Sequence, residues 1–139
     1  MDAKVIWKSG MSFSGIADSG FEIPLGTSIE NGGAADGLSP MELLLIGLGG
    51  CTGLDVISIL EKKRQNVTHL EMRLHGDRAT DHPHVFKEIM LEYVVTGHAV
   101  DPEAVQRAVE LSQTKYCSAS AMLSKSANIK TKITILEEK

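Results

Sequence analysis

The spacing of apolar side chains divides the chain into strand-like and helix-like stretches. Residues 3–26 alternate apolar and polar positions between glycines, which predicts an N-terminal antiparallel β-meander. Alternation over 67–76 and 86–97 predicts two more strands joined by a polar loop, and a last strand is expected over 130–137. The stretch 26–38 is rich in Gly, Asn and Asp and is expected to be a loop.

The stretch 40–62 has a different pattern, with apolar or small residues at almost every position around the helical wheel. An N-cap Ser39, a proline at the first helical position and Glu42 three residues after the cap predict where this helix begins. A helix that is apolar all round is buried all round, so we expect it to run through the middle of the fold. With further helices over 102–127, the sequence predicts one α+β domain spanning residues 1–139.

The predicted helix 40–62 is also long enough to suggest a membrane span. Four glycines lower its apolarity and Asp55 interrupts it, so we expect no insertion into a membrane. The glycines Gly47, Gly50 and Gly53 recur at three-residue spacing, which lets another helix backbone approach closely. Since the chain offers little material to surround such a helix, a partner subunit is expected.

The composition is that of an ordinary globular protein, with 139 residues, 42% of them hydrophobic and 23% charged. A net charge of −4 argues against broad attraction to nucleic acid or anionic lipid. The first residues lack the basic, apolar and small-residue regions of a signal peptide, so a cytoplasmic protein is expected. In a reducing compartment, two cysteines are expected to be free thiols or a catalytic couple.

Those two cysteines, Cys51 and Cys117, are the candidate chemistry. Cys51 lies among glycines in the predicted helix 40–62, where a small substrate such as a peroxide has room to reach the sulfur. Cys117 directly precedes Ser118, a good N-cap residue, and the positive end of the following helix would favour its thiolate. Residue types alone leave two readings open, a redox couple or two buried packing residues, because free cysteine is among the most buried residue types.

Motifs around both cysteines carry a resemblance. The residues are Ser39-Pro40-Met41-Glu42-Leu43-Leu44-Leu45, Gly49-Gly50-Cys51, Asp55-Val56-Ile57, Tyr116-Cys117-Ser118 and Asn128-Ile129. Together they resemble the OsmC-like branch of the OsmC/Ohr superfamily, the osmotically inducible and organic hydroperoxide resistance proteins. The resemblance implies an intertwined homodimer in which antiparallel sheets wrap two long central helices, with two sites at the subunit interface.

The resemblance also implies a reaction. Cys51 would attack the O–O bond of an organic hydroperoxide and become a sulfenic acid, Cys117 would resolve it as a disulfide, and an external dithiol would reduce that disulfide. The implied role is oxidative-stress defence, and we expect no cofactor and no metal ion. The alternative on the same scaffold is a non-catalytic protein that binds a small ligand or carries a thiol.

Two charged groups of the family pattern are not where the resemblance would put them. In the peroxidase branches a glutamate directly follows the proline and pairs with an arginine from the N-terminal strands. Here Met41 follows Pro40, and no arginine precedes Arg64. Glu42 comes one residue later, where its simplest role is to complete the capping box.

Two other residues are weaker candidates for a supporting role. Lys8 could supply positive charge from the first strand, although a lysine on an edge strand is usually a solvated residue. Asp55 lies one helical turn after Cys51, and an ionised carboxylate there would oppose thiolate formation. A buried acid satisfied across a dimer is an equally good reading of Asp55.

Overall fold

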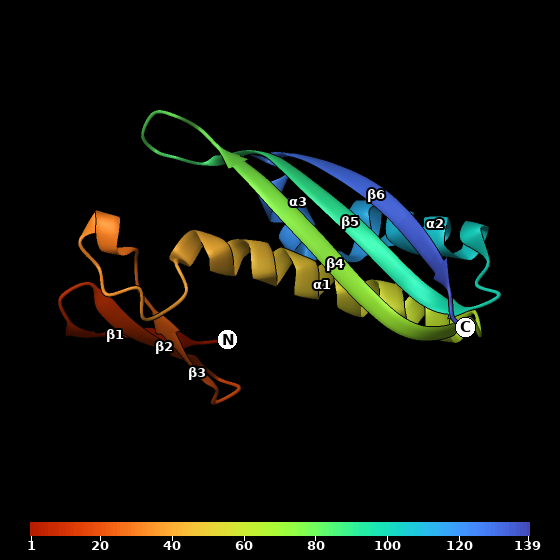
Figure 1. The fold of residues 1–139 in the computed structure, drawn as a ribbon, viewed down its shortest axis with the longest axis horizontal. Helices are drawn as coiled ribbons and strands as arrows, with labels where there is room; N and C mark the ends of the chain where they lie inside the picture. Colours follow the sequence, from red (N-terminus) through yellow and green to blue (C-terminus); the bar gives the residue numbers. More distant parts are fainter. The chain divides into compact units, whose positions relative to one another are not determined.

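The computed structural model describes all of residues 1–139, which form two compact units, Met1–Leu44 and Leu45–Lys139. A long helix, α1 (Pro40–Lys62), begins in the first unit and continues through the second (Figure 1). At its start the Ser39 N–H donates to Glu42 Oε1 at 2.8 Å, and the Glu42 N–H donates to the Ser39 hydroxyl at 3.2 Å. The predicted capping box is confirmed.

The first unit is a three-stranded antiparallel meander, as the alternating pattern predicted. Its elements are β1 (Ala3–Ser9), β2 (Ser12–Ala17), β3 (Glu22–Leu25) and the short 3-10 turn η1 (Ile29–Asn31). The register sets Trp7 opposite Phe13 and Val5 opposite Gly15, which gathers apolar residues on one face of the sheet. Nothing within the first unit covers this face, and Val5 is 61% and Trp7 63% exposed.

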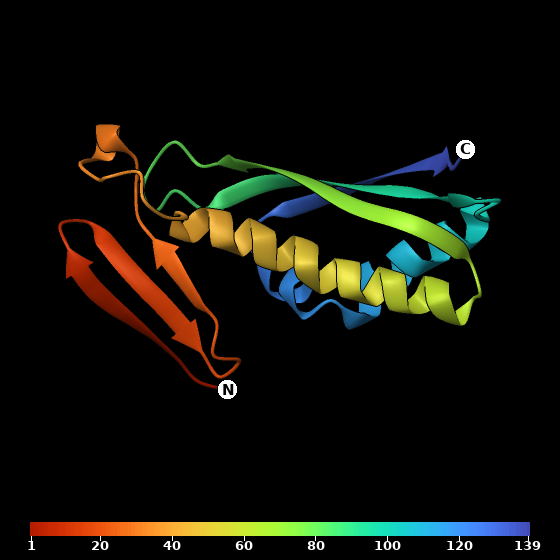
Figure 2. The same ribbon diagram turned by 60° about the horizontal axis from the view of Figure 1, so that its bottom comes forward.

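The second unit has two layers, a three-stranded sheet and the helices that cover one of its faces (Figures 1 and 2). The strands, in spatial order, are β4 (Asn66–Arg78), β5 (Phe86–His98) and β6 (Asn128–Glu137). Helix α1 lies under this sheet together with α2 (Pro102–Leu111), a single π-helical turn η2 (Ser112–Tyr116) and α3 (Ser118–Leu123).

The core of the second unit is built around β5. Its inward side chains, predicted from the alternating pattern, are all fully buried: Ile89, Leu91, Tyr93 and Val95. The last three join one cluster with residues of α1 and α2, including Val56, Leu60, Val105 and Ala108. Each large apolar side chain buried in this way contributes about 1.5–3 kcal/mol to the folded state. Helix α1 is therefore anchored to the sheet along the half of its length that follows Cys51.

The pairing of the last strand differs from the antiparallel sheets that the resemblance implied. Strands β4 and β5 are antiparallel, but β6 runs parallel to β5, with Ile89 opposite Ile129 and Tyr93 opposite Ile133. Parallel neighbours require a crossover connection, which α2, η2 and α3 supply here. This crossover carries η2 and Cys117 back to the face of the sheet on which α1 packs.

Helix α1 is not buried all round, in contrast to the prediction. Leu60 is fully buried whereas Leu54 is 72% exposed. The glycines divide in the same way: a Cβ at Gly53 would collide with the Met72 side chain of β4, but one at Gly50 would meet no atom within 4 Å. The second unit by itself covers only one side of the helix. By length and composition α1 is also the one helix apolar enough to cross a membrane, a property that core helices of soluble proteins share.

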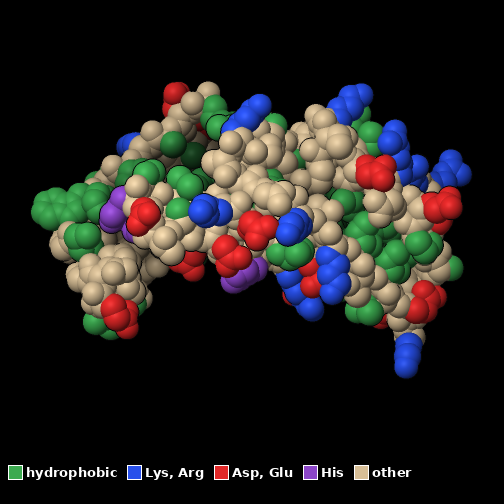
Figure 3. All heavy atoms as spheres, turned by 90° about the horizontal axis from the view of Figure 1, so that it is seen from above, with side chains coloured by type: hydrophobic (Ala, Val, Ile, Leu, Met, Phe, Trp, Pro, Cys, Tyr) green, Lys and Arg blue, Asp and Glu red, His purple; other side chains and the backbone are tan.

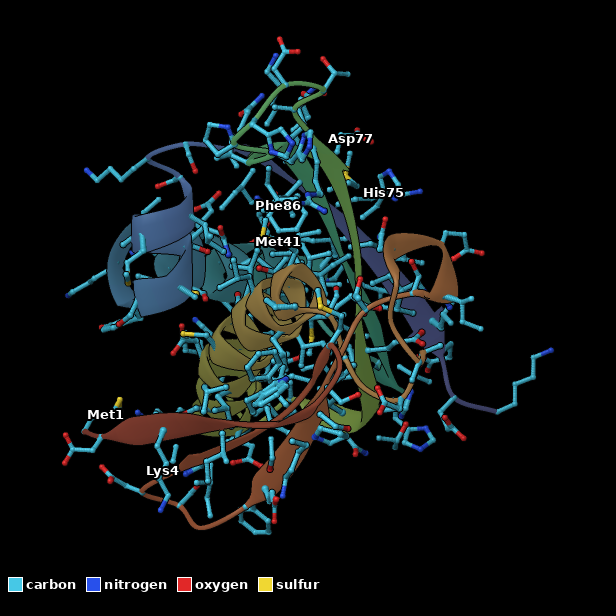
Figure 4. All side chains as sticks on the ribbon, turned by 90° about the vertical axis from the view of Figure 1, so that its left-hand side faces the viewer. Met1, Lys4, Met41, His75, Asp77 and Phe86 are labelled. Atoms are coloured by element: carbon cyan, nitrogen blue, oxygen red, sulfur yellow. The ribbon has the colours of Figure 1, made fainter.

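The outer face of the second sheet is polar. Lys130 Nζ lies 2.9 Å from Glu88 Oε1, and on the edge strand β4 the exposed His75 Nε2 lies 2.9 Å from Asp77 Oδ1 (Figure 4). Basic and acidic side chains are interspersed over the face seen in Figure 3. Exposed pairs of this kind contribute little to stability, so the sheet is held by its buried face.

Candidate functional site

The structure brings Cys51 of α1 and Cys117 together. Cys117 lies between η2 and α3, and Cys51 is close enough to act on the pKa of its thiol. Both are free thiols. They differ in access, since Cys117 is 3% exposed and Cys51 is only half-buried. The site thus contains one thiol that solvent and small molecules can reach and a second one behind it.

Cys117 is itself the N-cap of α3. Its backbone is extended, with φ −74° and ψ 104°, and its Sγ accepts the N–H of Ser120 at 3.3 Å. Sequence reasoning placed the cap at Ser118, but the extended residue comes one position earlier. The Cys117 N–H in turn donates to the Ser112 carbonyl at 2.8 Å, which closes the π-helical turn.

The environment of Cys117 keeps its proton in place. Burial raises the pKa of the Cys117 thiol, and hydrogen bonds from the Ser120 side chain and backbone lower it in part. Cys51 raises the pKa of Cys117 further, because two adjacent thiols resist carrying two negative charges. Cys117 therefore remains an S–H group up to a higher pH than a free cysteine.

A buried polar cluster lies beside the thiols. Thr52, the neighbour of Cys51 on α1, is fully buried, and its hydroxyl lies 2.7 Å from both the Tyr93 hydroxyl of β5 and the Ser112 hydroxyl of η2. The Ser112 hydroxyl also donates to Asp55 Oδ2 at 2.9 Å. No buried side-chain nitrogen or oxygen of the chain lacks a partner. The cluster therefore joins three elements by satisfied hydrogen bonds.

Gln113 connects this polar cluster to Cys117. Its Nε2 donates to the Tyr93 hydroxyl at 2.9 Å and to the Thr52 hydroxyl at 3.2 Å. Its Oε1 accepts the Ser120 hydroxyl at 3.0 Å, and Ser120 is the residue whose N–H reaches Cys117. Burial raises the pKa of Tyr93, so this phenol keeps its proton and acts as a donor. Hydrogen bonds thus lead from Asp55 through the polar cluster to the Ser120 hydroxyl, and the backbone N–H of the same serine reaches the Cys117 sulfur.

The Cys117 end of this series of hydrogen bonds is close to the surface. Gln113 and Ser120 line a hollow of about 540 Å³, and Lys125 and Asn128 also contribute to its lining. The hollow lies between η2, α3 and the start of β6, on the second unit alone. Water and small polar molecules can therefore approach Gln113, which is half-buried, whereas the Ser120 side chain is only 2% exposed.

The weaker candidates from the sequence have other partners. Asp55 accepts Ser112, and its charge acts on the pKa of Tyr93, which it raises. Glu42 is engaged by Ser39, whose hydrogen bonds, the backbone N–H first, lower the pKa of Glu42. Glu42 and Lys8 belong to the first unit and the two thiols to the second. A supporting role for Glu42, Lys8 or Asp55 at the thiols stays a prediction.

The polar residues of the cluster were not predicted from the sequence. They are Thr52, Tyr93, Ser112, Gln113 and Ser120. One signal was present, because Ser112 continues the apolar face of α2 that contains Val105, Ala108 and Val109. A hydroxyl on a buried face requires a hydrogen-bond partner, so Ser112 in this position indicates a buried polar site.

Comparison with known proteins gives consistent results. The family model described as OsmC-like protein matches residues 32–132. Protein YhfA of Escherichia coli (strain K12) is 42% identical over 130 residues, 93% of each chain. A crystal structure of a hypothetical protein from Aquifex aeolicus VF5 is 37% identical, with a TM-score of 0.88 over 99% of this chain and 97% of that one.

A more distant solved structure bears on the fold alone. The organic hydroperoxide resistance protein OhrB of Bacillus subtilis is 20% identical, with a TM-score of 0.66 over 96% of this chain and 98% of that one. The α+β fold class predicted from the sequence is confirmed.

Proposed function

The chain belongs to the OsmC-like protein family, as its cysteine motifs predicted, and on this basis we propose that it is a thiol-dependent peroxidase that reduces organic hydroperoxides. The observation that carries the proposal is the meeting of a half-buried thiol, Cys51, with a buried one, Cys117. The proposed role is oxidative-stress defence in the cytoplasm, where an external dithiol keeps the pair reduced.

The exposure of the two sulfurs supports their roles. Cys51, the accessible one, attacks an oxygen of the hydroperoxide as a thiolate. The S–O bond forms at the terminal oxygen as the O–O bond breaks, so that Cys51 becomes a sulfenic acid, and the departing alkoxide takes up from solvent the proton that the Cys51 thiol had released. The Cys117 sulfur then attacks Cys51 Sγ, the S–O bond breaks, and the hydroxyl leaves as water with the proton of Cys117. Thiol–disulfide exchange with a dithiol restores both thiols.

Cys117 also offers a substitute for the missing glutamate and arginine. A hydrogen bond to a charged form stabilises that form. Because Cys117 keeps its proton and lies close to Cys51, its S–H can donate to the Cys51 thiolate. In this proposal Cys117 therefore first stabilises the Cys51 thiolate and later, in the resolving step, attacks Cys51.

We further propose that the working form is a homodimer. Two apolar surfaces of the chain are uncovered: the α1 face that contains Ile46 (55% exposed) and Leu54 (72%), and the meander face that contains Val5 and Trp7. Contiguous exposed apolar surface of this kind marks interaction sites. A second copy presents the same two surfaces, so a two-fold symmetric pair can cover both.

The assignment is tested by peroxide consumption with an organic hydroperoxide and a dithiol reductant. We expect turnover in the wild type, background rates in Cys51→Ser, and in Cys117→Ser one equivalent consumed without efficient recycling. Ser118→Ala, an exposed neighbour of Cys117, is the matched control and should behave as the wild type. Turnover that survives in Cys51→Ser would contradict the proposal. Absence of turnover in the wild type would favour the thiol-carrier or ligand-binding alternative.

A further inference from the structure

The hydrogen bonds that lead to Cys117 have no part in the reaction steps above. We infer that Ser120 and Gln113 are positioning residues for the resolving step, with the Ser120 hydroxyl turning from Gln113 to the Cys117 sulfur as that sulfur gains negative charge. This inference rests on the proposed function. To the proposed function it adds two residues that affect the reactivity of Cys117 and leave that of Cys51 unchanged.

The direction of every proton in the polar cluster follows from counting donors. Asp55, as an ionised carboxylate, only accepts, so the single proton of the Ser112 hydroxyl goes to it. The Thr52 proton then goes to Ser112, and the Tyr93 proton to Thr52. All three hydroxyl protons point toward Asp55 and away from Cys117. The cluster is thus a fixed scaffold with a single arrangement of donors.

This scaffold fixes the orientation of Gln113. Its Nε2 has two protons, and Tyr93 and Thr52 accept one each. The amide oxygen must therefore face the other way, where it accepts the Ser120 hydroxyl at 3.0 Å. A flipped amide would set a carbonyl oxygen against two hydroxyls whose protons are already committed. The amide oxygen of Gln113 is thus held in a fixed position as a hydrogen-bond acceptor for the Ser120 hydroxyl.

The Ser120 hydroxyl has two acceptors and one proton. One acceptor is Gln113 Oε1, which holds the hydroxyl in this structure. The other is the Cys117 sulfur, which already accepts the Ser120 N–H at 3.3 Å and so lies beside this side chain. Ser120 is 2% exposed, so water hardly competes for this proton. A hydrogen bond to an ionised acceptor is roughly twice as strong as one between neutral groups. While Cys117 is a neutral thiol, the Ser120 hydroxyl therefore donates to Gln113. Once Cys117 is a thiolate, the hydroxyl donates to the Cys117 sulfur instead.

In the resolving step the Cys117 sulfur gains negative charge. When Cys117 attacks the sulfenic sulfur of Cys51, the S–S bond forms, the S–O bond breaks, and the Cys117 proton leaves with the hydroxyl as water. The titratable groups that face Cys117 are Cys51 of α1 and Tyr93 of β5, with Asp55 beyond Ser112. Cys51 is then a neutral sulfenic acid and Tyr93 a neutral phenol. Ser120 supplies the hydrogen bonds, from its N–H and its hydroxyl, that stabilise the attacking sulfur.

The test measures the ionisation of Cys117 without any peroxide. In a Cys51→Ser background, the pH dependence of iodoacetamide alkylation reports the pKa of Cys117. Ser120→Ala should raise this pKa by about one, the typical effect of a lost hydrogen bond to a charged group. Gln113→Leu should lower it, because the Ser120 hydroxyl loses its competing acceptor. Ser124→Ala, which removes a hydroxyl bound only to the Ala121 carbonyl, should leave it unchanged.

The opposite signs exclude a merely structural effect. Loosening of the fold would expose Cys117 in both variants and shift its pKa in the same direction. Equal shifts, or no shift in Ser120→Ala, would overturn the inference. With Cys51 present, dimedone trapping adds a kinetic readout: Ser120→Ala should slow disulfide formation about tenfold and leave sulfenic acid formation unchanged. If the protein forms no sulfenic acid, the proposed function fails, while the alkylation result still decides the role of Ser120.

Discussion

At the scale of single residues, Thr52 is the centre of the buried polar cluster. It directly follows Cys51, is fully buried, and has three hydrogen-bond partners on two other elements. A buried hydroxyl that loses its partner costs about 1–3 kcal/mol. The hydrogen bonds of Thr52 therefore both stabilise the second unit and hold the helix turn that carries Cys51 in place.

We predict that Thr52→Val destabilises the reduced protein by about 1–3 kcal/mol. Valine has nearly the same shape, so no cavity forms, and the loss comes from the hydrogen bonds that the Tyr93 and Ser112 hydroxyls make with Thr52. Urea denaturation of the reduced protein measures the change. Thr114→Val is the matched control, since the exposed Thr114 hydroxyl bonds only to the Glu110 carbonyl, and it should change stability by less than about 0.5 kcal/mol. Equal stabilities of the two variants would refute the account of the cluster.

At the scale of elements, the π-helical turn η2 determines where Cys117 lies. Its closing bond runs from the Cys117 N–H to the Ser112 carbonyl, five residues back rather than four. One extra residue is thus accommodated between the buried face of α2 and the start of α3. Ser112 and Gln113 face α1 and β5 as a result, and Cys117 meets Cys51.

We predict that deletion of the exposed Thr114 abolishes formation of the Cys51–Cys117 disulfide. Removing one residue restores an α-helical register and rotates Cys117 by about 100° relative to α2. The measurement is the count of free thiols after treatment with diamide, and circular dichroism verifies that the helices remain. Deletion of Asp81, an exposed residue of the β4–β5 loop, is the control and should leave the disulfide intact. A disulfide that forms with normal yield in the Thr114 deletion would contradict this role of η2.

The sequence predicted correctly those elements that depend on residues close together in the chain. The start of α1 follows from a capping box, and the inward residues of β5 follow from strict alternation. The parallel pairing of β6 was not predicted, because it depends on how the crossover returns to the sheet. The π turn was missed too, since one inserted residue barely changes apolar spacing over five positions.

The same contrast holds for the candidate site. The cysteines were identified because thiols are rare and stand in distinctive motifs. Thr52, Gln113 and Ser120 belong to residue types that are common on surfaces, and only the fold shows that they converge. The N-cap of α3 was assigned one residue late, because sulfur is a less usual cap than the hydroxyl of Ser118.

At the scale of the whole molecule, two observations have to be explained together. The thiols and the polar cluster lie entirely within residues 45–139, yet each unit by itself leaves apolar surface uncovered, on α1 in one and on the meander in the other. Isolated exposed apolar residues need no explanation, but exposed apolar side chains that gather on the same face of an element do. Self-association explains both without changing the site within each chain.

We predict that Leu54→Glu converts the protein from a dimer into a monomer. A carboxylate at this position on α1 would have to be buried unpaired in the proposed interface, at a large cost in free energy. Sedimentation equilibrium should give twice the chain mass of 15.0 kDa for the wild type and the single chain mass for the variant. Met122→Glu is the control, since Met122 of α3 is 75% exposed and lies outside both surfaces. A monomeric wild type would contradict the proposal.

Cys51 and Cys117 are proposed to act as one redox couple. The decisive measurement is the intact mass of the protein after one equivalent of an organic hydroperoxide. We expect a loss of two hydrogens per chain in the wild type, from the disulfide, and a gain of one oxygen in Cys117→Ser, from a sulfenic acid that cannot be resolved. An unchanged wild-type mass, or oxygen gained there without the disulfide, would contradict the proposal.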